Sequence, residues 1–491
     1  MDEGTRRLGT AIIKIEQSAD PRLSSMKEIT PAARPADDGI PRTEGGFRRV
    51  LSLRDLALFG IAFVGPTAPY SMFGIATVKS QGHLPLVYFV AMIAMSFTAI
   101  SYGRMAAAYP EAGSTYSYAS KALHPVMGLL AGWSMILDYI LIPMLSVIFV
   151  GLTAHKVWPE MPYLAWAILT AGGITAINLR GIQMTSRANY VMNLIMGISL
   201  VWFILVALRA LLGGVGEGTL ISSKPFFNPT TFTTGEIVGA TSLAVLSFIG
   251  FDGVTTLAED AKNPQRDIGR ATILVCLICG CLFVLQSYLA QMIWPNYRSF
   301  SPVETAFMDV GQLVGGSALF YFLSFVLVVA GLASAVTGQA SASRLLCGMG
   351  RDRLLPYRIF GYVHPKLGTP VYSVLLMGGV HLTGALLLKY VEAAELVNFG
   401  AFVGFMSVNL CVIRHYFLRL RYRRGKQILT NLVHPALGFG ICFYIWLHLS
   451  HLALMLGALW MVLGFFYLLL LTRGFRRRLT ELRLGADPSG L

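Results

Sequence analysis

Long apolar runs separated by short polar connections occupy most of this 491-residue chain. A run of about 18 or more apolar residues is long enough to cross the hydrocarbon core of a bilayer as a helix. Twelve windows of this kind lie at residues 56–78, 84–103, 126–155, 162–178, 189–212, 236–257, 271–294, 317–343, 371–388, 393–415, 432–449 and 452–472. The pattern predicts an all-α integral membrane protein with twelve transmembrane helices.

Composition and charge support this prediction. Only 13% of the residues are charged, whereas soluble domains contain about 25%. Of the 39 Lys and Arg residues, most fall in the two tails and in alternate connections. The side opposite the N-terminus contains only Lys79, Lys156, Arg209, Lys224, Arg298 and Lys389. This asymmetry follows the positive-inside rule, so we expect both termini in the cytoplasm. The net charge of +14 then reflects topology and contact with the lipid bilayer, and no nucleic-acid partner is expected.

Two of the apolar windows are interrupted in the middle. The first contains Gly65 and Pro66, and the sixth contains Gly250, Asp252 and Gly253. Proline cannot donate to the helical ladder and restricts the residue before it, and a carboxylate at mid-depth costs at least about 2.5 kcal/mol on insertion scales. Interruptions at corresponding places in two five-helix halves are typical of an inverted-repeat transporter. A proline kink alone is the alternative for the first window.

The predicted organisation is therefore a five-plus-five inverted repeat with broken helices 1 and 6, plus two extra C-terminal helices. The expected parts are a disordered cytoplasmic tail at 1–47, the first five-helix repeat at 48–212, the second, inverted repeat at 213–426, helices 11 and 12 at 427–472, and a cytoplasmic tail at 473–491. Helices 11 and 12 lie outside the repeat, where they serve packing or a homodimer contact.

Half-helix ends at the two breaks leave backbone N–H and C=O groups free, and these suit an anionic and a cationic group respectively. A zwitterion such as an amino acid matches that pair. We expect Gly65 to Thr67 to receive a carboxylate, and carbonyls near Asp252 to receive an ammonium group, with Phe248 and Phe251 as lids. The candidate substrate-binding residues are Ala62, Gly65, Pro66, Thr67, Ser71, Asp138, Ser247, Phe248, Gly250, Phe251 and Asp252.

Other polar groups have competing interpretations. Asp138 is a second intramembrane carboxylate and a functional candidate, or it hydrogen-bonds a neighbouring helix. Tyr116 is either a gating residue or part of an aromatic belt. The hydroxyl residues Ser334, Thr337 and Ser341 line a sodium site or simply allow close helix packing. The cysteines of CLICGC at 276–281 lack accompanying ligands and are interpreted as small buried hydrophobes, so neither a metal nor an organic cofactor is expected.

Seven ordered motifs resemble those of the amino acid, polyamine and organocation (APC) superfamily, and the pattern is most similar to the bacterial putrescine importers. The motifs are AISYG at 99, PEAGSTYSYASK at 110, GWSMILDY at 132, SFIGFDGVTTLAED at 247, SRLLCGMGRD at 343, FGYVHPKLGTP at 360 and VNFGAFVGF at 397. The resemblance covers about residues 53–473. It implies secondary import across the bacterial inner membrane by alternating access, with the substrate at the breaks of helices 1 and 6.

The resemblance also assigns residues and shows two departures. Asp252 falls where relatives keep an acid beside the substrate, and Glu259 where the putrescine importers keep a glutamate. Those importers carry an aspartate where Ser71 stands, so one of the two acids that a diamine needs is missing unless Asp138 or Glu259 compensates. Some relatives place a proton-carrying lysine in helix 5, but residues 188–208 contain none. Asp252 or Glu259 is therefore the expected proton carrier.

The sequence thus predicts a secondary active importer of amino acids or polyamines with a proton as the coupling ion and sodium as the alternative. An amine exchanger and a nutrient sensor that binds without transporting would use the same site. A channel would need rings of hydrophilic residues that these helices lack. A membrane-embedded enzyme would need a nucleophile or metal constellation, and the nine His residues show no such spacing within a span.

Overall fold

The computed structural model describes residues 51–110, 114–181, 186–258, 260–351 and 355–472. These residues are helical apart from their connections and one isolated β-bridge between Leu51 and Ala261. Within the described ranges, nine helices are long and apolar enough to cross a membrane, or ten if one bent pair is counted as a single span. The shorter apolar helices α7 and α13 fall in the fourth and ninth predicted windows. The prediction of an all-α, multi-pass membrane protein is confirmed.

The helices follow the predicted windows closely. In chain order they are α2 (Leu53–Val64), α3 (Pro69–Lys79), α4 (Leu84–Ala108), α5 (Ser114–Ala122), α6 (Pro125–Val157), α7 (Tyr163–Leu179), α8 (Ser186–Leu212), α9 (Thr234–Ala244), α10 (Pro264–Ile293), α11 (Ala306–Arg351), α12 (Tyr357–Phe360), α13 (Val371–Leu387), α14 (Tyr390–Val412), α15 (Lys426–Ile428), α16 (His434–Trp446) and α17 (His451–Leu471). Two 3₁₀ segments, η2 (Val245–Phe248) and η3 (Phe251–Leu257), follow α9. A π-helical segment, η6 (Ile413–Arg419), continues α14.

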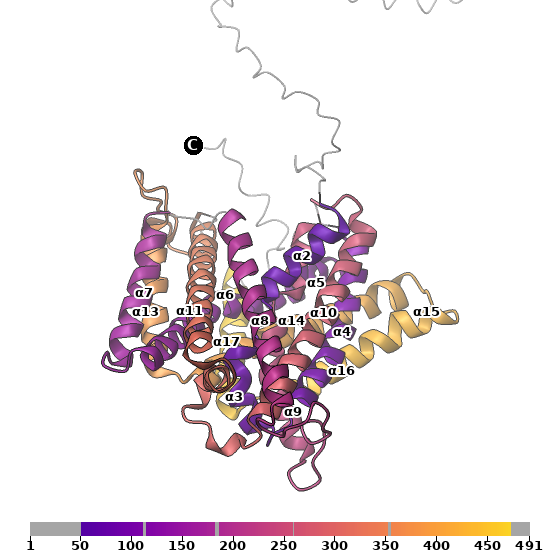
Figure 1. Cartoon of the computed structure of the whole chain (residues 1–491). Coiled ribbons are helices and arrows are strands. Elements are labelled where there is room, and N and C mark those ends of the chain that lie inside the picture. The colour runs from indigo at the N-terminus through magenta and orange to yellow at the C-terminus, as the bar shows by residue number, and fades with distance from the viewer. Residues whose placement is uncertain (1–50, 111–113, 182–185, 259, 352–354, 473–491) are drawn as a thin grey trace, which may run out of the picture. The chain divides into compact units, whose positions relative to one another are not determined.

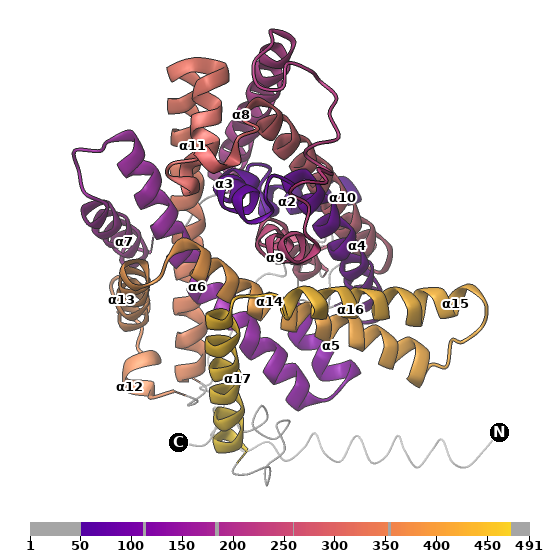
Figure 2. The ribbon, with the colours of Figure 1, turned by 90° about the horizontal axis from the view of Figure 1, so that it is seen from below.

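The interrupted segments lie in the middle of the bundle. Figure 2 shows α2, α3 and α9 surrounded by α4 and α10 on one side and by α6, α8, α11 and α14 on the others. The helices α7 and α13 pack together at one margin, and α16 extends past α4 at the other. A polar break is therefore shielded by neighbouring helices, as irregular backbone at membrane depth must be.

Figure 1 shows α2 and α3 extending toward opposite ends of the bundle. We call one end the basic end, because the C-terminal end of α4, the N-terminal end of α10 and η6 bring Arg104, Arg266, Arg270 and Arg419 there. The other is the loop end, which contains the connection 213–233 and the C-terminal end of α3. These names are used below without reference to a side of the membrane.

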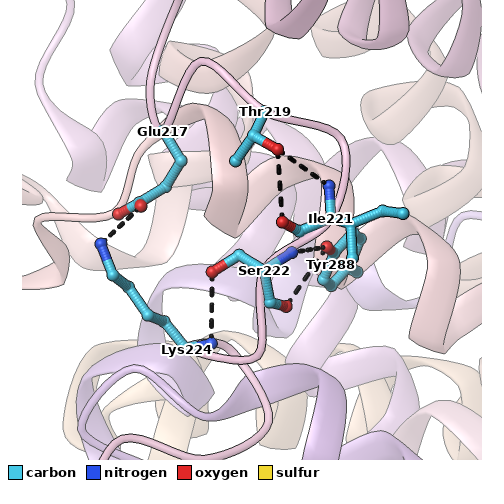
Figure 3. Close-up of polar contacts among 6 residues, drawn as sticks. All are labelled: Glu217, Thr219, Ile221, Ser222, Lys224 and Tyr288. Atoms are coloured by element: carbon cyan, nitrogen blue, oxygen red, sulfur yellow. Dashed lines mark hydrogen bonds and ion pairs between the residues drawn. The ribbon is translucent and has the colours of Figure 1, made fainter.

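Two ion pairs join helices at the loop end, and a third lies within the connection 213–233. Lys79 Nζ on α3 lies 2.8 Å from the carboxylate of Glu395 on α14, whose side chain is only 2% exposed. Lys156 pairs with Asp309 at 2.9 Å. Figure 3 shows the Lys224–Glu217 pair within the connection and the Tyr288 hydroxyl of α10, which accepts from the Ser222 N–H at 2.8 Å. At the loop end, these contacts join α3 to α14, α6 to α11, and the connection 213–233 to α10.

Candidate substrate site

The first interruption separates α2 from α3 where the sequence predicts it, with a bend of 57° between the two helices. Gly65 ends α2 with a positive φ of 82°, and its N–H donates to the Ile61 carbonyl. Pro66 supplies no donor. The carbonyls of Ala62, Phe63 and Val64 consequently have no hydrogen-bond donor among the described residues. This end of α2 presents free acceptors, which suit a cation or a hydrogen-bond donor.

The same break offers few donors for a carboxylate. Of the three residues predicted to receive one, Gly65 has its N–H already bonded and Pro66 has none. The N–H of the buried Thr67 has no acceptor among the described residues. The Pro66 carbonyl accepts from Gln286 Nε2 of α10 at 3.1 Å. Gln286 Nε2 also donates to the Leu282 carbonyl at 3.0 Å, so both of its hydrogens are in use. An anionic group at this break would therefore depend on the Thr67 N–H, and not on a row of amides.

The second interruption lies at Gly250, again where the sequence predicts it. The helix α9 tightens into η2 and stops, Gly250 adopts a left-handed conformation with φ 116°, and the chain resumes as the 3₁₀ segment η3. A 3₁₀ run of this length often marks a functional hinge or a strained sequence. The carbonyls of Ser247 and Phe248 have no hydrogen-bond donor among the described residues. The prediction of free carbonyls beside Asp252 thus agrees with the structure.

The glycines of the second break allow the two interrupted segments to touch. A Cβ atom on Gly250 would lie 2.9 Å from Phe63 Cδ1, and one on Gly253 would lie 2.7 Å from Phe63 Cε1. The Phe63 ring of α2 therefore packs directly against the backbone of η3. Residues with side chains would separate α2 from η3, so glycine here brings the ends of the two breaks together.

Two acids, one on α6 and one on η3, interact electrostatically in this region. Asp138 of α6 is only 6% exposed, and its Oδ1 atom is buried without a hydrogen-bond partner. It interacts electrostatically with Asp252 of η3. The Asp252 carboxylate also lies beside the Tyr102 hydroxyl and the N–H groups of Gly250 and Gly253. Two neighbouring carboxylates surrounded by protein cannot both stay ionised at low cost unless a cation or a proton compensates them.

Tyr102 of α4 connects the acid pair to the α5 segment. Its hydroxyl lies 2.6 Å from the Thr115 hydroxyl. Its ring packs edge-on against Phe251, with ring centroids 5.8 Å apart, and against Tyr118 at 6.4 Å. We call Tyr102, Thr115, Asp138 and Asp252 the acid cluster. It joins four separate elements, so movement of α5 or η3 changes the environment of both carboxylates.

The remaining predicted residues are distributed around this cluster. Phe248 and Phe251 are fully buried, against Phe283 and Phe405 respectively, and so form walls in this conformation. The Ser247 hydroxyl lies 3.1 Å from the Tyr88 hydroxyl. Ser71, in the first turn of α3, donates to the Ala68 carbonyl at 3.2 Å. Ser71 therefore lies on the α3 side of the first break.

The structure does not bring every predicted residue to the cluster. Tyr116 is 36% exposed and packs against Gly132, whereas Tyr118, two residues later, faces Tyr102. Glu259 lies outside the described residues. For the sodium alternative, the hydroxyls of Thr337 and Ser341 donate to the carbonyls of Ala333 and Thr337 within α11. Of the three cysteines of CLICGC, the free Cys276 and Cys279 are buried as predicted, whereas Cys281 is exposed.

Three residues of this region escaped the sequence-based selection: Tyr88, Tyr102 and Gln286. Gln286 is one of two glutamines, with Gln291, in the apolar window 271–294, and a buried amide in a membrane span is itself a signal that could have identified it. The two tyrosines carry no comparable signal, because an aromatic residue in an apolar helix is usually packing. Tyr102 was noted only within the AISYG motif.

Known transporters are similar to this protein over most of its length. The family model for amino acid permeases matches residues 58–475. The low-affinity putrescine importer PlaP of Escherichia coli K12 is 33% identical over 87% of this chain and 95% of its own length. The branched-chain amino acid permease BcaP of Bacillus subtilis is 26% identical over 87% of this chain and 94% of its own. The methylthioribose transporter of Bacillus subtilis is also 26% identical, over 85% and 92%.

Proposed function

Because the chain belongs to the amino acid permease family, whose members are transporters and not enzymes, we propose that it is a secondary active importer of amino acids or amines coupled to protons. The observation that carries this proposal is that two buried acids, Asp138 and Asp252, lie close enough to interact electrostatically, with Asp252 at the second helix break. Two carboxylates can hold one ammonium group and one proton at the same time. Substrate and proton would then cross together, as import driven by an inward proton gradient requires.

The arrangement of the acids favours a substrate with one ammonium group at the cluster. Asp138 and Asp252 lie together, so they serve the same cationic end. The second amine of a diamine would need a further acid, and Ser71 is an alcohol where the putrescine importers resemble this chain but carry an aspartate. A carboxylate at the other end would meet the Thr67 N–H at the first break. The similarity to a putrescine importer and to a branched-chain amino acid permease leaves amines and amino acids as the two substrate classes to be tested.

Alternating access is the proposed mechanism. The buried Lys79–Glu395 pair joins α3 to α14 at the loop end, and Glu395 also accepts from the Ser450 N–H at 3.1 Å. Opening of the loop end would require these contacts to separate. In that state, α5 and η3 would block access to the acid cluster from the basic end. By the positive-inside rule, we place the basic end on the cytoplasmic side of a bacterial inner membrane.

The repeat organisation belongs to the same proposal. Residues 48–212 and 213–426 would form the two inverted repeats, each with one interrupted helix at its start, within a total of twelve spans. The extra helices α16 and α17 are the proposed homodimer contact, because only 28% and 22% of the apolar windows that contain them are buried in the single chain. Chemical cross-linking in membranes through cysteines placed on α17 would test that contact.

Uptake into proteoliposomes tests the function directly. The purified chain is reconstituted, and radiolabelled putrescine, leucine, arginine and butylamine are supplied with and without an imposed pH gradient, acid outside. We expect at least one substrate to accumulate, and to do so faster with the gradient. Uptake indifferent to the gradient would remove proton coupling. Uptake that requires preloaded unlabelled substrate would identify an exchanger, and saturable binding without flux would identify a sensor.

A further inference from the structure

A groove that the transport site does not use lies at the basic end between α4 and α10. It is an open hollow of about 380 Å³, and η6 contributes Tyr416 to its rim. The two helices touch at Gly103 and Gly269, where a Cβ atom on Gly103 would lie 2.6 Å from the Gly269 Cα. This close backbone contact forms the floor of the groove. The remaining lining residues are Ile100, Arg104, Ala107, Gln265, Arg266, Arg270 and Ile273.

Three guanidinium groups line the groove, and none has an acidic partner among the described residues. Arg266 and Arg270 are exposed and one helical turn apart in the first two turns of α10. Arg104 faces them from α4. The acidic residue next to Arg266, Asp267, is buried and accepts from Asn263 at 3.4 Å. No acid lines the groove, so its charge is uncompensated within the described part of the chain.

Arg104 is held in place for a ligand by groups that do not neutralise it. Its guanidinium lies over the Tyr416 ring, 4.4 Å from the centroid, and its backbone carbonyl accepts from the Tyr416 hydroxyl at 3.0 Å. Its Nε atom is buried and has no hydrogen-bond partner. A buried donor without an acceptor is unfavourable, and an anion in the groove would satisfy it. Stacking therefore orients this arginine while one of its donors stays available.

We propose that this groove binds the phosphate of an anionic phospholipid in the leaflet at the basic end. Arginine forks match phosphate oxygens geometrically, and three of them converge here. The apolar lining indicates a lipid as the source of the phosphate. Along α4 and α10, the faces below the arginines continue through Ile100 and Ile273 to the exposed Ile93, Leu274 and Leu277. These residues follow at helical spacing from Arg104 and Arg270, and they provide a surface for an acyl chain.

A lipid bound in this groove would contact α4 and α10, the two helices that also contact the breaks of the transport site. The helices α4 and α10 supply Tyr102 and Gln286, which contact the second and the first break respectively. A headgroup that bridges Arg104 to Arg266 and Arg270 would hold α4, α10 and η6 together at the basic end. Anionic lipid is therefore expected to stabilise the protein as well as to bind it.

Native mass spectrometry of the purified full chain tests the proposal. The protein is titrated with phosphatidylglycerol and with phosphatidylcholine of identical acyl chains. We expect preferential binding of phosphatidylglycerol that falls about twentyfold in an Arg266→Ala/Arg270→Ala variant, since each basic residue near a membrane surface contributes roughly fivefold to binding. The matched control is Arg344→Ala/Arg358→Ala, which removes two exposed arginines of α11 and α12 that do not line the groove.

Further measurements separate the possible outcomes. An Arg266→Lys/Arg270→Lys variant keeps the charge and should retain most of the lipid binding, which shows that the alanine variant lost a ligand and not its fold. Equal binding of both lipids, or an equal loss in the control variant, would overturn the proposal. Displacement of the lipid by millimolar inorganic phosphate would also overturn it, because the groove would then be a site for a soluble anion.

Discussion

The two interruptions at the centre of the bundle are built differently. At the first, α-helix resumes after a 57° bend, and the buried Pro66 carbonyl accepts a hydrogen bond from the Gln286 amide of a neighbouring helix. At the second, the chain resumes as 3₁₀ helix, and it brings its own charge in Asp252. The first break is uncharged and is bonded by a side chain of α10, whereas the second carries Asp252, which interacts electrostatically with a second acid, Asp138. We infer that the first break mainly shapes the site and that the second carries the charge chemistry.

Removal of the Asp252 charge should have the largest effect. An Asp252→Asn substitution keeps the size of the side chain but leaves the substrate ammonium facing only Asp138. Loss of one partner of a buried charge pair costs about 2 kcal/mol or more, so the ratio of the maximal uptake rate to KM should fall at least about thirtyfold. Initial rates in proteoliposomes measure this. Glu217→Gln is the control, because its carboxylate pairs with Lys224 at the loop end, and its uptake should not change. Normal transport by Asp252→Asn would show that Asp252 does not bind the substrate ammonium group.

The glycines at the two breaks should differ in their sensitivity to alanine. Gly65 and Gly250 both have positive φ, which costs an L-residue roughly 1–2 kcal/mol. A Cβ atom on Gly65 meets nothing within 4 Å, whereas one on Gly250 would lie 2.9 Å from the Phe63 ring and 3.2 Å from its carbonyl. Gly250→Ala should therefore lower the unfolding temperature and the transport rate more than Gly65→Ala. Gly172→Ala, with an open environment and ordinary φ, serves as the control. Equal effects of the two substitutions would contradict the contact between the breaks.

Gln286 should matter for the first break without touching the charge. Replacement by Leu leaves the buried Pro66 carbonyl without its donor, which costs about 1–3 kcal/mol. We expect a lower free energy of unfolding and a several-fold higher KM, with the pH dependence of uptake unchanged. Thermal unfolding and uptake at two pH values measure these quantities. If the pH dependence moved as well, the first break would be part of the proton pathway, and the division between the two breaks would be wrong.

The contrast also explains which parts of the site the sequence could predict. Both breaks were predictable because glycine, proline and aspartate are unfavourable in the middle of an apolar span. The 3₁₀ form of η3 was not, since it depends on the contact of Gly250 and Gly253 with Phe63. The electrostatic interaction of Asp138 with Asp252 was equally hidden, because the two residues are far apart in the sequence and their elements are brought near each other by the packing of α5 against both α6 and η3. Tyr102 was missed for the same reason.

The smallest and most specific effect is expected at Ser71, the position that distinguishes this chain from the putrescine importers it resembles. Ser71→Asp would place an acid beyond the first break, separated from the acid cluster, and would supply a partner for the second amine of a diamine. Putrescine should then gain about fivefold over butylamine in competition for uptake, since an added favourable charge contact in a partly exposed site contributes roughly 1 kcal/mol. Ser71→Asn adds similar volume without charge and should leave the ratio unchanged. A wild-type ratio that already favours putrescine, and that Ser71→Asp does not raise, would show that Asp138 and Asp252 serve two cationic ends and not one.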